Sequence, residues 1–236
     1  MIITNRSNRF ALILFLAGIM LPCSPVFQQK TIASASEVIV TDRPMSANTP
    51  DLSIRIPATF HPQRFNRAAG LKNHHFITWK EGNAAGRALF TTTVADSTVH
   101  DALLGIGARP GNNLTEKSWT ARKNRRSPFP DMLIEGTVVQ IDFLIDGDTI
   151  GAHDILRDDA GNAFDFRFGG NRDLISVWQS GCVVCLQSCP GSKIGNRTYS
   201  IRDLVKGHSQ FSVKKDSRLE DGDTLEIRFS IIAEQH

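Results

Sequence analysis

Seven short runs of β-forming residues, spread along most of the chain, constrain the fold of this sequence more than any other feature. In each run Val, Ile, Thr and Phe recur with a period of two, which is the pattern of a strand with one buried face. They predict a sheet of mostly antiparallel strands. The runs are "LSIRI" (52–56), "HHFITW" (74–79), "RALFTTTV" (87–94), "LIEGTVVQIDFLI" (133–145), "DTIGAHDIL" (148–156), "AFDFRF" (163–168) and "TLEIRFSII" (224–232).

One segment, at about 96–107, has a different pattern. Asp96 or Ser97 can cap the start of a helix there, and Gly107 can end it. A second, weaker helix is indicated at "SIRDLVKG", which Gly207 closes. The fold class is therefore α+β, with mostly antiparallel strands and one clear short helix packed on them. The apolar residues at helical spacing in the first segment are Val99, Ala102, Leu103 and Ile106.

The tetrapeptide Asp-Gly-Asp-Thr occurs twice between apolar runs, at 146–149 and at 221–224. Asp-Gly favours the tight turns that join antiparallel strands, because those turns need positive φ. A calcium-binding loop would need further oxygen ligands and a closing glutamate at fixed positions. Neither copy has them, so both are interpreted as turns.

The N-terminal residues have the pattern of a secretory signal peptide. Arg6 and Arg9 precede the apolar run 10–21, and the small residues around Ala35 follow it. The run is shorter than the roughly 20 apolar residues of a membrane span. We expect export to the periplasm or medium, with cleavage after Ala35. Pro22 makes Cys23 a poor lipoprotein site.

Export changes the charge balance and the organisation that we expect. Without 1–35 the chain keeps 24 basic and 24 acidic residues, which gives no long-range attraction to nucleic acid. The basic run "ARKNRRSP" is then a surface loop or a patch for an anionic partner. We expect an extended lead-in at 36–50 and one α+β domain at 51–236, with no membrane span in the mature chain.

The most distinctive chemical feature is a cysteine loop at 180–193, "SGCVVCLQSCPGSK". Cys182, Cys185 and Cys189 follow the spacing C-x2-C-x3-C-P. This matches the last three cysteines and the proline of a ferredoxin-type iron–sulfur run, with Gln179 where the first cysteine should be. A 4Fe–4S-like cluster would therefore lack one thiolate.

A mononuclear metal is a second interpretation of the loop. Three thiolates suit a soft ion such as Cu(I), or zinc with one more ligand. His208 and His153 are candidate fourth ligands, although neither has metal-like spacing to the cysteines.

Thiol chemistry is a third interpretation, and neither metal nor cluster is favoured over it. An oxidising compartment favours disulfides, and three cysteines leave one free thiol. The Cys182/Cys185 pair could also be redox-active, with Cys182 attacking and Cys185 resolving. Reactive C-x-x-C pairs usually lie at a helix N-terminus, whereas Gly181, Pro190 and Gly191 indicate a loop here.

Other polar residues carry weaker signals. His74 and His75 are adjacent in a predicted strand and should face opposite sides of the sheet. Asp96 and His100 are four residues apart on the predicted helix, which is typical of a surface pair. The three tryptophans, Trp79, Trp119 and Trp178, are expected in the core.

The segment around 74–113 resembles the YdjY-like family of exported bacterial proteins. A strand-rich opening leads to a helix with His100, Ala102 and Leu103, followed by Gly107, Ala108, Pro110 and Gly111. The family has no firmly assigned activity, so the resemblance implies the α+β fold and no chemistry. The cysteine loop departs from the familiar pattern, and its function has to come from its own residues.

The sequence favours an exported, non-enzymatic binding or accessory protein of the envelope. Its cysteine loop would form a disulfide or a metal–thiolate site for a redox or electron-transfer partner. The alternative is a thiol–disulfide oxidoreductase that uses Cys182 and Cys185.

Overall fold

A computed structural model describes residues 45–48, 51–68, 73–124 and 126–232. The predicted signal peptide, Cys23 and most of the predicted lead-in lie outside these residues. The last part of the lead-in, β1 (Ser46–Asn48), is a strand that pairs antiparallel with β2 (Ser53–Phe60). No helix in the described ranges has both the length and the apolar character that crossing a membrane requires.

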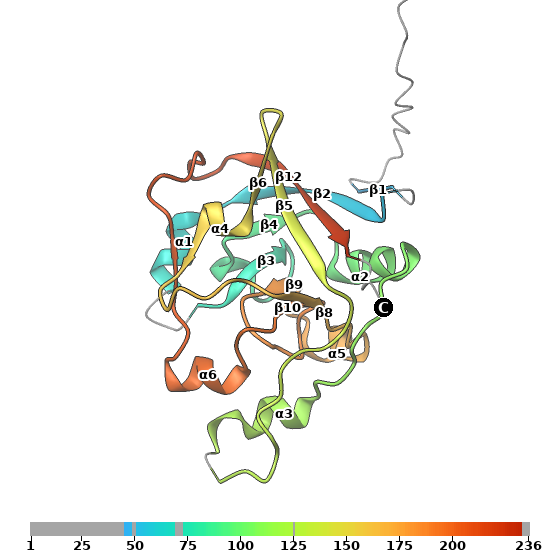
Figure 1. Cartoon of the computed structure of the whole chain (residues 1–236), viewed down its shortest axis with the longest axis vertical. Coiled ribbons are helices and arrows are strands. Elements are labelled where there is room, and N and C mark those ends of the chain that lie inside the picture. The colour runs from blue at the N-terminus through green and yellow to red at the C-terminus, as the bar shows by residue number, and fades with distance from the viewer. Residues whose placement is uncertain (1–44, 49–50, 69–72, 125, 233–236) are drawn as a thin grey trace, which may run out of the picture. The chain divides into compact units, whose positions relative to one another are not determined.

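Within the described residues ten strands form one sheet, and its pairings are mostly antiparallel. Only β3 with β4 and β9 with β10 pair in parallel. The predicted predominance of antiparallel strands is therefore confirmed. Along the sheet, with β1 attached to β2, the order is β6 (Asp148–Gly151), β5 (Val139–Ile145), β12 (Thr224–Ile231), β2, β4 (Phe90–Thr92), β3 (His75–Trp79), β9 (Cys182–Cys185), β10 (Ile194–Asn196) and β8 (Phe166–Phe168). Figure 1 shows its strands β5, β12 and β2.

The sheet curls, so that its β8 end returns to the residues just before β5. Val138 and Arg167 form an antiparallel bridge, and the Phe168 amide donates to the Thr137 carbonyl at 2.9 Å. A small separate sheet joins β7 (Leu156–Asp158) to β11 (Phe211–Val213).

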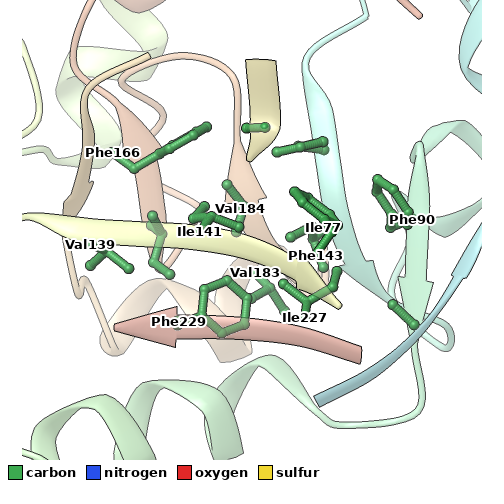
Figure 2. Close-up of a cluster of buried hydrophobic side chains, with 14 of the residues drawn as sticks. Ile77, Phe90, Val139, Ile141, Phe143, Phe166, Val183, Val184, Ile227 and Phe229 are labelled. Carbon is green, nitrogen blue, oxygen red and sulfur yellow. The ribbon is translucent and has the colours of Figure 1, made fainter. Parts of the chain in front are cut away.

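The main core fills the curled sheet and is mostly aliphatic and phenylalanine. Figure 2 shows Ile227 and Phe229 of β12 beside Val183 of β9, with Phe143 of β5 beside Ile77 of β3. Burial at about 25 cal/mol per Å² of apolar surface is the main stabilising term of such a core. Since β9 contributes Val183 and Val184 to it, the position of the strand that carries two cysteines is set by the core.

Helices are short and more numerous than the one clear helix that the sequence predicts. The predicted helix at about 96–107 is α2 (Asp96–Gly105), and the weaker one is α6 (Ile201–Lys206), capped by Ser200 and closed by Gly207 at φ 77°. The sequence patterns do not predict the other helices. They are α1 (Pro62–Ala68), α3 (Glu116–Thr120), α4 (Ala152–Ile155) and α5 (Asp173–Trp178), with 3₁₀ turns η2 (Ala85–Arg87) and η3 (Ala121–Lys123).

The two Asp-Gly turns have different settings. Asp146 and Gly147 both have positive φ and join β5 to β6 as a hairpin, as predicted. Gly222, at φ 97°, also lies in a turn. That turn leads into β12, whose partners are β2 and β5, so the second copy closes no hairpin.

Candidate functional site

The cysteine segment begins as a central strand of the sheet, where the sequence indicated a loop. β9 pairs with β3 on one side and β10 on the other, and its four residues are all buried. Its valines enter the main core, whereas Cys182 and Cys185 enter a second cluster. That cluster also contains Cys189, Ile201 and Leu204, with Trp119 and Trp178 packed against it.

The three described cysteines are free thiols that contact one another, so the disulfide expected from the sequence is not formed here. Cys185 has no exposed surface and shares hydrogen bonds with both Cys182 and Cys189. Burial first, and then these two hydrogen bonds, raise the pKa of the Cys185 thiol well above its usual value. Cys185 is therefore held protonated behind the other two sulfurs.

Cys189 lies in surroundings of the opposite kind. The hydrogen bond from the Cys185 thiol is the largest influence and lowers the pKa of Cys189, against the effect of burial. Backbone amides of Gly191 and Ser192 and the nearby Lys193 ammonium lower it further. Hydrogen bonds and a positive charge of this kind stabilise a thiolate.

The positive charge beneath the loop belongs to Lys193, which is fully buried. Its Nζ lies 3.7 Å from Oδ2 of Asp96 and donates to the Gly191 carbonyl at 3.3 Å. Burial lowers the pKa of Lys193, while Asp96, Cys182 and Cys189 act to raise it. Asp96 is thus the partner of Lys193. His100 instead contacts Asp101, with Nδ1 and Oδ1 3.0 Å apart, so the predicted surface pair is wrong.

Both adjacent histidines lie at the cysteine cluster. The His75 ring is buried, with Nδ1 3.7 Å from Sγ of Cys182, and its centroid is 4.2 Å from that of His74. Burial, then His74 and Arg87, hold the pKa of His75 well below its usual 6.5. β3 is irregular where it pairs with β9. The prediction that the two rings face opposite sides is therefore wrong.

A cavity of about 400 Å³ opens on these groups. Its wall includes Cys182 and Cys189, both histidines and Arg87, and its described lining contains no Asp or Glu. The wall also contains two indoles, Trp119 and Trp178, whose ring centroids lie 5.2 Å apart. The guanidinium of Arg122 stacks 3.8 Å from the centroid of the Trp119 ring.

Gly191 fixes one wall of the cavity by allowing close approach of an indole. A Cβ at this position would lie 2.2 Å from Cε3 of Trp178, so no side chain fits there. Trp178, which ends α5, therefore packs directly on the turn that follows Cys189.

Three larger hollows, of about 890, 660 and 490 Å³, lie elsewhere. In the first, buried Asp142 is already paired with Arg228 at 2.7 Å. In the second, Arg167 is paired with Asp165 at 2.7 Å. None of the three has a cysteine in its described lining, and the cysteine cavity is the candidate site.

The structure brings together the three predicted cysteines but not the proposed fourth ligands. His208 lies 3.3 Å from Asp203 and His153 lies 3.3 Å from Asp154, both exposed. Gln179, in the position of the missing cluster cysteine, is exposed at the end of α5. Within the described ranges, no group of three or more His, Cys, Asp or Glu side chains is arranged to hold a metal ion.

Several residues at the site could not be identified from the sequence. Trp119 and Trp178 are far apart along the chain and resemble ordinary core residues, and Lys193 resembles a surface lysine. Arg122 belongs to the basic run that the sequence offered as a surface loop or a patch for an anionic partner, but nothing in the sequence places it near the cysteine loop. Lys193 was the one with a usable signal, because it lies four residues after Cys189 in the same Gly/Pro-bounded segment.

Comparisons with known proteins show the family and leave the site open. The model of the YdjY domain family matches residues 45–230. The "Uncharacterized protein YdjY" of Escherichia coli (strain K12) is 28% identical over 134 residues, which are 56% of this chain. The match spans 55% of that protein's length. No solved structure matches. Neither the comparisons nor the side-chain arrangement supports the partial iron–sulfur motif.

Proposed function

The chain belongs to the YdjY domain family, and from that premise we propose that it is an exported thiol–disulfide exchange protein of the cell envelope. The observation that carries the proposal is the asymmetry between two hydrogen-bonded thiols. Cys189 lines the cavity in surroundings that favour its thiolate, and Cys185 lies behind it as a protonated thiol. The basic, apolar and small-residue pattern of the N-terminus supports the exported location.

In this proposal Cys189 is the attacking thiol and Cys185 the resolving thiol. The Cys189 thiolate attacks one sulfur of a substrate disulfide, forms a mixed disulfide and releases the other half as a thiolate. Cys185 then attacks the Cys189 sulfur, and its proton passes to the departing second thiolate. Two electrons reach the substrate, and a Cys185–Cys189 disulfide remains.

Cys182 has a supporting place in this scheme, unlike its attacking role in the sequence hypothesis. Its Sγ contacts the Val184 carbonyl at 3.4 Å and the His75 ring. It also shares a hydrogen bond with Cys185. These contacts hold Cys182 beside Cys185, and in the proposed scheme Cys182 is the free thiol of the oxidised protein.

The test is a redox titration of the mature protein, followed by alkylation while denatured and intact-mass measurement. Oxidation should remove two alkyl tags from the wild type and from Cys182→Ala. It should remove none from Cys185→Ala or Cys189→Ala at the same potential. Circular dichroism and thermal unfolding of each variant check that the fold is retained.

Two results would contradict the proposal. If all tags persist at every potential, or if the native protein carries a stoichiometric metal on its thiols, the protein has no dithiol–disulfide couple. If Cys189→Ala still forms a disulfide with the wild-type midpoint potential and Cys182→Ala forms none, the redox couple is Cys182–Cys185 and the assignment of roles is wrong.

A further inference from the structure

We propose that the cavity selects small disulfides that carry carboxylates, and that Arg87 and Arg122 recognise their negative charge. The inference rests on the proposed exchange function and adds to it a substrate class. It follows from the charge, shape and accessibility of the cavity.

The charged groups at the cavity are positive. Arg87 lines the cavity. Arg122 is not a lining residue, but it lies over the ring of the lining Trp119 and close enough to Cys189 for the two charges to interact. In the described part of the chain, neither arginine has a carboxylate at ion-pair distance. Lys193 adds little to this field, because Asp96 partners it. Nη1 of Arg122 already donates to the Trp119 carbonyl at 2.7 Å, and the remaining N–H groups of both guanidinium groups can donate to an anion.

The shape of the cavity suits a small sulfur compound with charged ends. Ligand pockets usually measure about 300–1,000 Å³, and this one holds about 400 Å³. The two indoles offer an apolar wall to methylene and sulfur atoms, and sulfur packs favourably against aromatic rings. Guanidinium groups bind carboxylates in a two-pronged geometry, so the arginines are suited to the ends of such a molecule.

Limited access to the thiols favours a small molecule over a folded protein as the substrate. Cys189 is 6% exposed and Cys182 is 2% exposed. A disulfide on a protein surface would have to enter past Trp119 and Trp178 to reach the Cys189 sulfur. A free disulfide can enter the cavity without that constraint.

The experiment compares two short disulfides of similar size and opposite charge. The probes are 3,3′-dithiodipropionate, with two carboxylates, and cystamine, with two ammonium groups. For each probe, the rate of mixed-disulfide formation with the reduced protein is divided by the rate at which the same probe reacts with 2-mercaptoethanol. This normalisation removes the difference in intrinsic reactivity between the two probe disulfides. At low salt we expect the dicarboxylate to be preferred about tenfold, the low end of electrostatic effects on association rates. Added salt should reduce the preference.

Variants locate the source of the preference. Arg87→Gln and Arg122→Gln should each move the rate ratio toward one. Arg122→Lys should retain most of the preference, because it keeps the positive charge against Trp119. Arg126→Gln is the matched control: it removes an exposed charge from the same basic run, leaves the Arg122 guanidinium over Trp119, and should leave the ratio unchanged.

The outcomes separate this inference from the function on which it rests. Equal normalised rates for the two probes, with exchange intact, would overturn charge selection and leave the exchange function standing. Preference for cystamine would do the same. If neither probe reacts with the folded protein while both react with the urea-unfolded chain, the exchange function itself fails.

Discussion

At the scale of single residues, three cysteines with one spacing have three different environments. Cys185 is enclosed and protonated, Cys189 receives backbone amides and faces cationic groups, and Cys182 lies against a histidine. A pKa follows burial, neighbouring charges and hydrogen bonds. None of these is set by the C-x2-C-x3-C spacing, so the spacing could not indicate which sulfur would react.

His75 gives a prediction at this scale. The folded protein keeps the ring neutral at pH values where the unfolded chain takes up a proton, because the pKa of His75 is well below 6.5 when folded. Below about pH 6.5 the unfolded state therefore binds more protons, and the free energy of unfolding falls as the pH falls, by at most about 1.4 kcal/mol per unit for this group.

Urea unfolding at pH 7 and pH 5 measures this effect. His75→Gln should lose less stability between the two pH values than the wild type does. His153→Gln is the control, since that side chain is 78% exposed, and it should follow the wild type. Equal losses in His75→Gln and wild type would show that His75 is protonated in the folded protein.

At the scale of elements, β9 determines the site because it belongs to two packed clusters at once. Its valines are fixed by the core inside the curled sheet (Figure 2). Its cysteines belong to the cluster that contains Ile201 and Leu204 of α6, with the two indoles packed against it. Four consecutive apolar residues are compatible with a buried strand or with a buried loop. Pairing with β3 and β10 is what decides in favour of the strand.

Burial in β12 gives a matched pair of substitutions. Ile227 has no exposed surface and lies between β2 and β5, so Ile227→Ala should cost about 2–5 kcal/mol of unfolding free energy. Ile232, just beyond the strand, is 46% exposed, and Ile232→Ala should change stability by about 0.5 kcal/mol or less. Chemical denaturation measures both, and similar losses for the two variants would contradict the predicted core.

At the scale of the whole molecule, the proposed function depends on two features. The fold brings distant segments together at the cavity, and the N-terminal pattern indicates export to the envelope. Segments near 75, 119, 178 and 189 meet at one cavity. An envelope location would place the cysteine cluster in an oxidising compartment, where a disulfide can form and be exchanged.

Export yields a prediction for the intact protein. In the mature protein taken from the envelope, we expect an N-terminus at Ser36. Without Cys23, full reduction and alkylation should add three tags. Intact-mass measurement gives both results at once. A fourth tag, or a lipid adduct on Cys23, would show that cleavage after Ala35 is wrong.

Local patterns in the sequence determined much of the fold. Period-two runs placed β2, β3, β5 and β12, helical spacing with a closing glycine placed α2 and α6, and Asp-Gly placed the β5–β6 turn. These features follow from interactions within a few residues. Helices α3 and α5 were not predicted, because neither ends at a glycine as α6 does: Ala121 follows α3 and Gln179 follows α5.

The sequence by itself also determined that three thiols would lie close together, since one short segment carries them. Only the tertiary structure decided what surrounds them: a buried Lys193 paired with Asp96, His75 beside Cys182, and two indoles closing the cavity. The physical reason is that burial and electrostatic fields depend on distances in space. Residues far apart in the sequence can be close in space: His75 and Cys182 are 107 positions apart and are brought together by the pairing of β3 with β9.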